Sequence, residues 1–378
     1  MARIPLGRDA GFNPTVFYGA IAIIIALLGF ALVNADGAEE LFLSLQRMAS
    51  INFGWLLILT VNILLGTSVF IAVSKLGDIR LGGPDAKPEF SRTAWFAMLF
   101  SAGMGIGLLF YGVAEPIMHF GNPPTTHFSH AGATDAMSIA GNAQHAMGLT
   151  YLHWGLHAWA IYAMIALGLA YVSFNRGTTL SIGAFLHQVW PRLPRIVVDL
   201  VDILAIVATV CGVATSLGFG AAQINAGLTN LFGTQDSFMA KAVIIALVTG
   251  LATMSVALGL ERGIKILSEG NMALAVGLAL FVVIAGPTVF LLDSFIQNLG
   301  YYIQRFVYLS TWTESYTAET WQLDWTIFYY AWWISWSPFV GIFIARISYG
   351  RTVREFVTGT LLVPTLFTFV WMTVFGDS

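Results

Sequence analysis

Residues 325–354 read WTIFYYAWWISWSPFVGIFIARISYGRTVR, a hydrophobic segment crowded with large aromatic residues and closed by arginines. In bilayer helices, Trp and Tyr gather at the two membrane–water interfaces, where the ring lies in hydrocarbon and the N–H or O–H reaches water. Here Trp332, Trp333 and Trp336 fall in the middle of the apolar run. These aromatic side chains therefore need an explanation other than interfacial anchoring.

The composition is that of a membrane protein. The 378 residues are 57% hydrophobic and 10% charged, and apolar runs of about 20 residues, the length that crosses a bilayer as a helix, recur along the chain. The formal charge of -3 argues against a nucleic-acid partner, and the single cysteine, Cys211, excludes an internal disulfide framework. We predict an all-α polytopic protein with nine spans: 15–33, 53–73, 94–113, 147–172, 198–219, 240–260, 266–292, 325–347 and 357–375.

The basic residues support this count. With nine spans, 14 of the 17 Lys and Arg residues fall on one side of the membrane, and only Arg47, Lys241 and Arg305 fall on the other. Cytoplasmic loops carry the excess of basic residues. We therefore expect a cytoplasmic amino terminus and a location in the inner (cytoplasmic) cell membrane. Between the spans, segment 293–319 has apolar residues at helical spacing and predicts an amphipathic surface helix, while 76–92 is a turn-rich inner link.

The third span contains a glycine run, SAGMGIGLLFYGVAEP at 101–116. Gly103, Gly105 and Gly107 each weaken a helix by roughly 1 kcal/mol relative to alanine. One interpretation is an interrupted span whose freed carbonyls coordinate a cation, and the other is close helix packing. We expect the neighbouring Glu115 to cap the outer end of this span.

The fourth span contains YLHWGLHAWAIYA at 151–163. At about 100° per residue, Trp154, Trp159 and Tyr162 fall within an arc of about 140°, so all three could face one cavity. A matching stripe in the opening segment contains Trp332, Trp336 and Phe339, with Trp333 about 100° to its side. Such rings could enclose a quaternary ammonium, because each π-face attracts a desolvated cation by about 2 kcal/mol. The alternative is ordinary packing between helices.

His153 and His157 stand four residues apart, as two metal ligands on one helix face would. The sequence places no Cys, Asp or Glu close by to complete a site, so we do not predict a metal there. The spans also contain no nucleophile–base arrangement, and we do not expect an enzyme.

With these motifs in hand, the chain resembles the betaine-carnitine-choline transporters. The resemblance covers almost the whole chain and is carried by 79–116, 153–163, 204–228, 262–275 and 325–354. It implies an aromatic box around a trimethylammonium group formed by Trp154, Trp159, Tyr162 and Trp333. Further aromatics along the substrate path would be Trp332, Trp336 and Phe339, and backbone donors near Gly103, Gly105 and Gly107 would meet the carboxylate of a betaine.

The resemblance also implies coupling to sodium. One ion site would use backbone oxygens of Ser101 and Met104, and another would use Thr209 together with a second threonine that is Val213 in this chain. Sodium-independent carnitine exchangers carry an Arg where this chain has Met272, which favours ion coupling. Choline carriers carry an Asp at the position of Gly107, so its absence here favours a zwitterion.

The fold implied by the resemblance is the inverted-repeat (LeuT-like) transporter fold. We divide the chain into 1–93 with two peripheral helices, 94–292 as a first five-helix repeat, 293–324 as an outer connection, and 325–378 as the start of a second repeat. Because twelve spans are expected and nine are found, the chain looks truncated. A homotrimer in the lipid bilayer is expected because relatives form one.

The function we expect is secondary active import of glycine betaine or a similar osmolyte by sodium symport with alternating access. The alternative is a proton-coupled or exchanging carrier for choline, carnitine, ectoine or a sulfonium analogue. No cofactor besides the coupling sodium ion is expected.

Overall fold

The computed structural model describes residues 12–103, 105–124, 136–259, 263–317 and 319–378. Within these ranges the regular elements are helices, joined by one isolated antiparallel bridge between Arg80 and Thr352. In this part of the chain eight helices are long and apolar enough to cross a membrane, and the count is nine if the bent pair α3 and α4 forms one span. The all-α polytopic class is confirmed.

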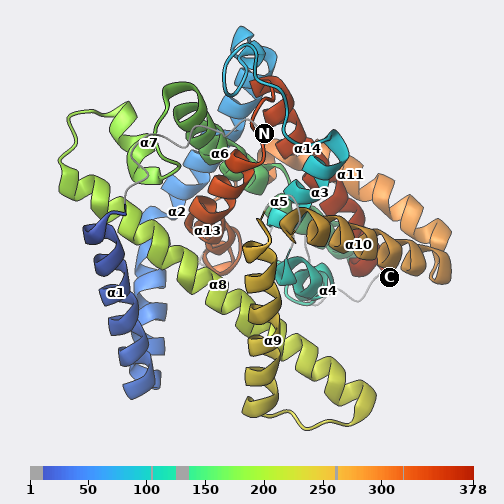
Figure 1. Cartoon of the computed structure of the whole chain (residues 1–378). Coiled ribbons are helices and arrows are strands. Elements are labelled where there is room, and N and C mark those ends of the chain that lie inside the picture. The colour runs from blue at the N-terminus through green and yellow to red at the C-terminus, as the bar shows by residue number, and fades with distance from the viewer. Residues whose placement is uncertain (1–11, 104, 125–135, 260–262, 318) are drawn as a thin grey trace. The chain divides into compact units, whose positions relative to one another are not determined.

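The chain divides into two compact units. The first comprises the described residues up to Glu89 together with Leu156–Val210 and Val307–Leu362. Its helices, drawn in Figure 1, are α1 (Pro14–Val33), α2 (Ala35–Val73), the 3₁₀ helix η1 (Lys75–Asp78), α6 (Leu156–Arg176), α7 (Ile182–Val189), α12 (Trp321–Asp324) and α13 (Thr326–Arg346).

The second unit comprises Phe90–Gly155, Cys211–Phe306 and Val363–Ser378, within the described residues. It contains α3 (Arg92–Gly103), α4 (Ile106–Gly121), α5 (Ala136–Trp154), α9 (Phe238–Ala257) and α10 (Lys265–Ala285). Three helices begin in one unit and end in the other: α8 (Arg195–Phe232), α11 (Thr288–Thr311) and α14 (Val353–Gly376).

The core of the first unit is formed by α2, α6 and α13, which contact one another pairwise. Glycines at the crossings let the helices approach closely. A Cβ on Gly341 of α13 would lie 2.8 Å from Ile165 of α6, and a Cβ on Gly54 of α2 would lie 2.5 Å from Ile327 of α13. This close packing buries aromatic residues of both α6 and α13.

The second unit has an aromatic core between α5 and α14. The ring of Tyr151 stacks on Phe369 with centroids 3.9 Å apart and an interplanar angle of 3°. The Tyr151 hydroxyl lies 2.6 Å from the Thr373 hydroxyl and donates to the Phe369 carbonyl over 3.0 Å. A buried phenol is thus satisfied inside a membrane protein, as a hydrocarbon environment requires.

Three predicted elements differ from the structure. Helix α2 begins at Ala35, well before the predicted span at 53, because a helix can continue beyond the hydrocarbon. The seventh span ends at Ala285 rather than 292, since Gly286 and Pro287 interrupt the chain before α11 begins. Helix α11 confirms a helix in the outer connection, but Ile303 of its predicted apolar face is 65% exposed, whereas Tyr302 is buried.

Segments predicted to share the inner side do contact one another in the first unit. Three backbone hydrogen bonds join residues 79–81 to residues 350–353. The N–H of Leu81 donates to the Arg351 carbonyl over 2.9 Å, that of Gly350 to the Leu81 carbonyl over 2.9 Å, and that of Val353 to the Ile79 carbonyl over 2.8 Å. We call the paired segments 79–81 and 350–353 the inner-loop junction. Two ion pairs support it, Arg354 with Asp78 at 3.2 Å and Arg346 with Glu89 at 3.0 Å.

Candidate functional site

Three of the four residues predicted to form the aromatic box lie together in the first unit. Trp159 and Tyr162 on α6 have ring centroids 5.7 Å apart, and Tyr162 lies 6.2 Å from Trp333 on α13. Both pairs meet edge to face, at 79° and 72°. All three side chains are at most 5% exposed. Two helices therefore present converging π-systems in a site from which water is excluded.

The remaining aromatics of α13 form two sets of ring contacts. Trp332 stacks on Trp333 with centroids 4.8 Å apart, and Tyr329, which was not among the predicted site residues, lies 5.6 Å from Trp333. Trp336 contacts Phe339 at 4.7 Å, and Phe339 is 42% exposed. The stripe predicted from helical spacing is therefore divided: Trp332 packs with Trp333, whereas Trp336 and Phe339 pack on each other.

Phe339 lines a cavity of about 1130 Å³ in the first unit. The walls of the cavity come from α1, α7, α8 and α13, and they include Thr209, the residue predicted for an ion site. The Thr209 hydroxyl donates to the Ala205 carbonyl of its own helix over 2.8 Å. A predicted substrate-path residue and a predicted ion-site residue therefore line the same cavity.

Charged side chains line the same cavity. Asp199 accepts hydrogen bonds from Asn13 at 2.9 Å and from Arg195 at 3.0 Å. Asp202 accepts one from the Gly183 backbone N–H at 2.7 Å. Because both carboxylates are held by protein donors, this charged lining is a fixed part of the unit.

The glycine run interrupts the third span, as one of the two interpretations predicts. Helix α3 ends at Gly103, α4 begins at Ile106, and the two are bent by 63°. A Cβ on Gly105 would meet no atom within 4 Å, so close packing does not explain this glycine. Gly105 precedes α4 without a side-chain cap, and Gly107 lies in the first turn. The N–H groups of such a helix start attract an anion such as a carboxylate.

Two predicted sodium ligands belong to the same run. The prediction for Ser101 concerns its backbone oxygen; its hydroxyl oxygen, a different atom, is buried on α3 and makes no hydrogen bond to the described residues. Met104 lies outside the described residues.

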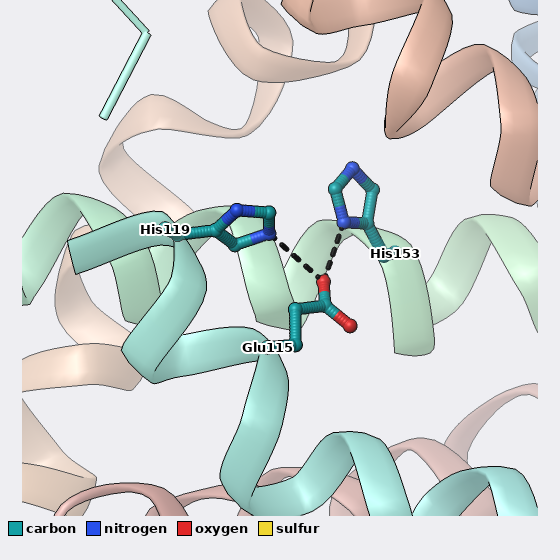
Figure 2. Close-up of side chains that lie close together, drawn as sticks. All are labelled: Glu115, His119 and His153. Atoms are coloured by element: carbon teal, nitrogen blue, oxygen red, sulfur yellow. Dashed lines mark hydrogen bonds and ion pairs between the residues drawn. The ribbon is translucent and has the colours of Figure 1, made fainter. Parts of the chain in front are cut away.

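The prediction that Glu115 caps the outer end of the third span was wrong. The residue does not cap the end of a span, because α4 continues to Gly121 and the Glu115 side chain is fully buried. One carboxylate oxygen, Oε1, lies 3.1 Å from His119 Nε2 and 2.6 Å from His153 Nδ1, as Figure 2 shows. The other, Oε2, accepts a hydrogen bond from the Trp154 indole N–H over 2.6 Å.

This contact fixes the ring of Trp154, the fourth predicted box residue, which ends α5 in the second unit. Its ring lies 6.0 Å from that of Tyr111 and is 4% exposed. The acidic partner for His153 that seemed to be missing from the sequence is therefore Glu115. His157 is not part of that group, since its ring stacks on Tyr330 at 6.0 Å in the first unit.

The contact between Glu115 and His119 was not predicted, although the sequence contains a signal for it. The two are four residues apart, which places both side chains on one face of a helix. Nothing in the sequence indicated that α5 would bring His153 against that face.

We expect Trp154→Phe to destabilise the protein by about 1.5–3 kcal/mol, because it removes a hydrogen bond to a carboxylate and keeps most of the ring. Trp371→Phe is the matched control. Its indole N–H donates over 3.2 Å to the uncharged Leu108 carbonyl, and that loss should cost only about 0.5–1.5 kcal/mol. Thermal unfolding in detergent measures both, and equal losses would show that the Glu115 contact has no special strength.

The chain is similar in sequence to known transporters. Residues 15–378 match the family model described as betaine/carnitine/choline family transporter. The chain is 48% identical over 97% of its length to an uncharacterized transporter of Mycobacterium tuberculosis, covering 61% of it. It is 45% identical over 96% of its length to the glycine betaine transporter OpuD of Bacillus subtilis (70% of it). It is 43% identical over 98% of its length to a glycine betaine transporter of Acinetobacter baylyi (55% of it).

The chain thus spans a little over half to about two thirds of the length of these curated relatives. The relatives are named as transporters, in agreement with the expectation that the chain is not an enzyme. A family match over nearly the whole chain settles its membership: it belongs to the betaine/carnitine/choline family of transporters.

Proposed function

We propose that the protein imports a quaternary-ammonium zwitterion, glycine betaine or a close analogue, by sodium symport. The observation that carries this proposal is the cluster of Trp159, Tyr162 and Trp333, three buried rings supplied by two contacting helices. Two of the relatives are named glycine betaine transporters, which supports the same substrate class.

The chemistry of these rings suits a trimethylammonium group. Such a cation has no N–H to donate and so makes no conventional hydrogen bond, whereas the faces of Trp and Tyr attract it electrostatically. The attraction grows when water is absent, and these side chains are almost fully buried. The rings now contact one another, so binding would require them to separate around the ligand.

The other end of the substrate favours a zwitterion over choline. The family resemblance implies that the carboxylate of a betaine meets backbone N–H donors near the glycine run, the kind of group that binds anions. Gly107 in the first turn of α4 carries no charge, whereas the family resemblance implies an Asp at this position in choline carriers. An uncharged turn offers no counter-ion to a substrate with a net positive charge.

Sodium coupling rests on three residues. The family resemblance assigns a backbone oxygen of Ser101 and the side chain of Thr209 to sodium sites, and it implies that sodium-independent exchangers have an arginine where this chain has Met272. In the inverted-repeat fold, rocking of one bundle against the other would alternate access to the site. We place the protein in the cytoplasmic membrane with the inner-loop junction on the cytoplasmic side. The homotrimer we propose rests on the family resemblance alone.

Uptake by proteoliposomes containing the full-length protein tests the proposal. We expect labelled glycine betaine to accumulate when sodium is higher outside, and uptake to fall to background when the sodium gradient is replaced by potassium. Choline and carnitine should compete weakly. Uptake driven by a proton gradient without sodium, or by exchange alone, would identify the alternative carrier, and a preference for choline would contradict the argument from Gly107.

A further inference from the structure

The cluster of Glu115, His119 and His153 has not been assigned a role by the transport proposal. Glu115 and His119 are one turn apart on α4, and His153 faces them from α5. Each of these side chains is at most 1% exposed. Figure 2 shows both imidazole rings turned toward the same carboxylate.

A fully buried group of ionisable side chains is expensive in a membrane helix. Removing such groups from water costs free energy that their mutual attraction only partly returns, and apolar side chains of similar size often serve stability equally well. Ionisable residues within membrane spans therefore mark functional sites by default. Packing alone does not account for a carboxylate and two imidazoles gathered at one point.

The spacing of the three groups suits a metal ion. One ligand atom from each residue lies within 4.8 Å of the others. Zinc binds nitrogen and oxygen ligands at about 2.0–2.1 Å, so neighbouring ligands of a tetrahedral site are about 3.3 Å apart. The His119–Glu115 distance of 3.1 Å already matches this value, and the His153–Glu115 distance of 2.6 Å would need to lengthen slightly. Small side-chain rotations are sufficient for such changes.

The donor set selects the type of metal. Two imidazoles and one carboxylate suit zinc and similar transition metals, whereas calcium and magnesium prefer oxygen ligands alone. Three protein ligands leave a fourth position for water or hydroxide. With a hydroxide there, a divalent ion and Glu115 would together be neutral, which lowers the cost of burial. The Trp154 indole N–H donates to Oε2, the carboxylate oxygen that does not face the histidines. Metal-binding carboxylates are commonly oriented by such a second hydrogen bond.

We propose that Glu115, His119 and His153 bind one zinc ion or a similar divalent transition-metal ion, which ties α4 to α5. Helix α4 begins directly after the interruption at Gly105, so the ion fixes the outer part of the broken span against its neighbour. Without metal, an imidazole N–H of each ring can donate to the carboxylate; on binding, the ligating nitrogen gives up its proton and the neutral ring carries its proton on the other nitrogen. This site does not depend on which substrate the protein carries.

Metal content and thermal unfolding test the proposal on the protein purified without a histidine tag and stripped with a chelator. We expect one zinc per chain after dialysis against zinc. At zinc concentrations about 100 times the Kd, the melting temperature should rise by roughly 3 °C, and equal magnesium should leave it unchanged. His119→Gln should abolish stoichiometric zinc. His145→Gln is the matched control, because His145 is also buried on α5 but hydrogen-bonds to Tyr301 at 2.8 Å.

Two results would overturn the site. One is a chelated parent protein that takes up no stoichiometric zinc or shows the same melting temperature in zinc and magnesium. The other is zinc retained by His119→Gln as tightly as by the parent. If His119→Gln fails to fold, the melting temperatures of the parent protein in zinc and in magnesium still test the site. Loss of sodium-driven uptake would leave these measurements unaffected, so the two proposals fail separately.

Discussion

Trp333→Leu should weaken binding of glycine betaine about 30-fold in the full-length protein. The substitution removes one π-face from a desolvated cation, which is worth about 2 kcal/mol, and each 1.4 kcal/mol changes affinity tenfold. Trp333→Phe keeps a smaller π-face and should lose much less. Equilibrium binding by tryptophan fluorescence or calorimetry, in sodium and in detergent, gives both affinities.

A packing defect has to be separated from the loss of the cation site. Trp333 is buried and packs against both Tyr329 and Trp332, so leucine there also leaves a void. Trp95→Leu provides the control, since Trp95 on α3 is fully buried and is not a predicted box residue. Both variants should lose similar thermal stability, but only Trp333→Leu should lose affinity. Unchanged affinity in Trp333→Leu, or an equal loss in Trp95→Leu, would reduce the cluster to helix packing.

The class of the protein and most of its spans could be predicted because hydrocarbon imposes one simple requirement on sequence. A run of about 20 apolar residues must be helical, since its backbone groups have no other partners. The ends of the spans were less predictable, because a helix such as α2 can continue into water on its own hydrogen bonds. The pairing of 79–81 with 350–353 agrees with the side assignment obtained from basic residues.

The aromatic cluster was partly predictable for a geometric reason. Trp159 and Tyr162 are three residues apart, so a helix places them on one face, and only the partner helix had to be supplied by resemblance. The environment of Glu115 could not be predicted in this way. A carboxylate beside a proline at the end of an apolar run is typical of a helix end. Glu115 is buried because α5 packs against α4, and the periodicity of either helix does not reveal that they pack together.

Gly350→Ala should be the most destabilising single substitution we propose, with a loss of about 2–6 kcal/mol in the free energy of unfolding. Gly350 has φ of +81°, a conformation that alanine adopts only with strain. An added Cβ would also overlap the Lys87 carbonyl group and the Pro88 nitrogen, which are backbone atoms and cannot rotate away. Strain and overpacking each contribute about 1–3 kcal/mol.

Gly83→Ala separates these two causes. Gly83 also has a positive φ, +100°, but a Cβ there would meet no atom within 4 Å. It should therefore lose only the strain term, about 1–3 kcal/mol. Unfolding of both variants in detergent, followed by circular dichroism, gives the comparison. The Gly350 N–H donates to the Leu81 carbonyl, so we expect unfolding of Gly350→Ala to begin with the separation of 79–81 from 350–353. Equal stabilities of the two variants would show instead that this junction is loose enough to accommodate a methyl group.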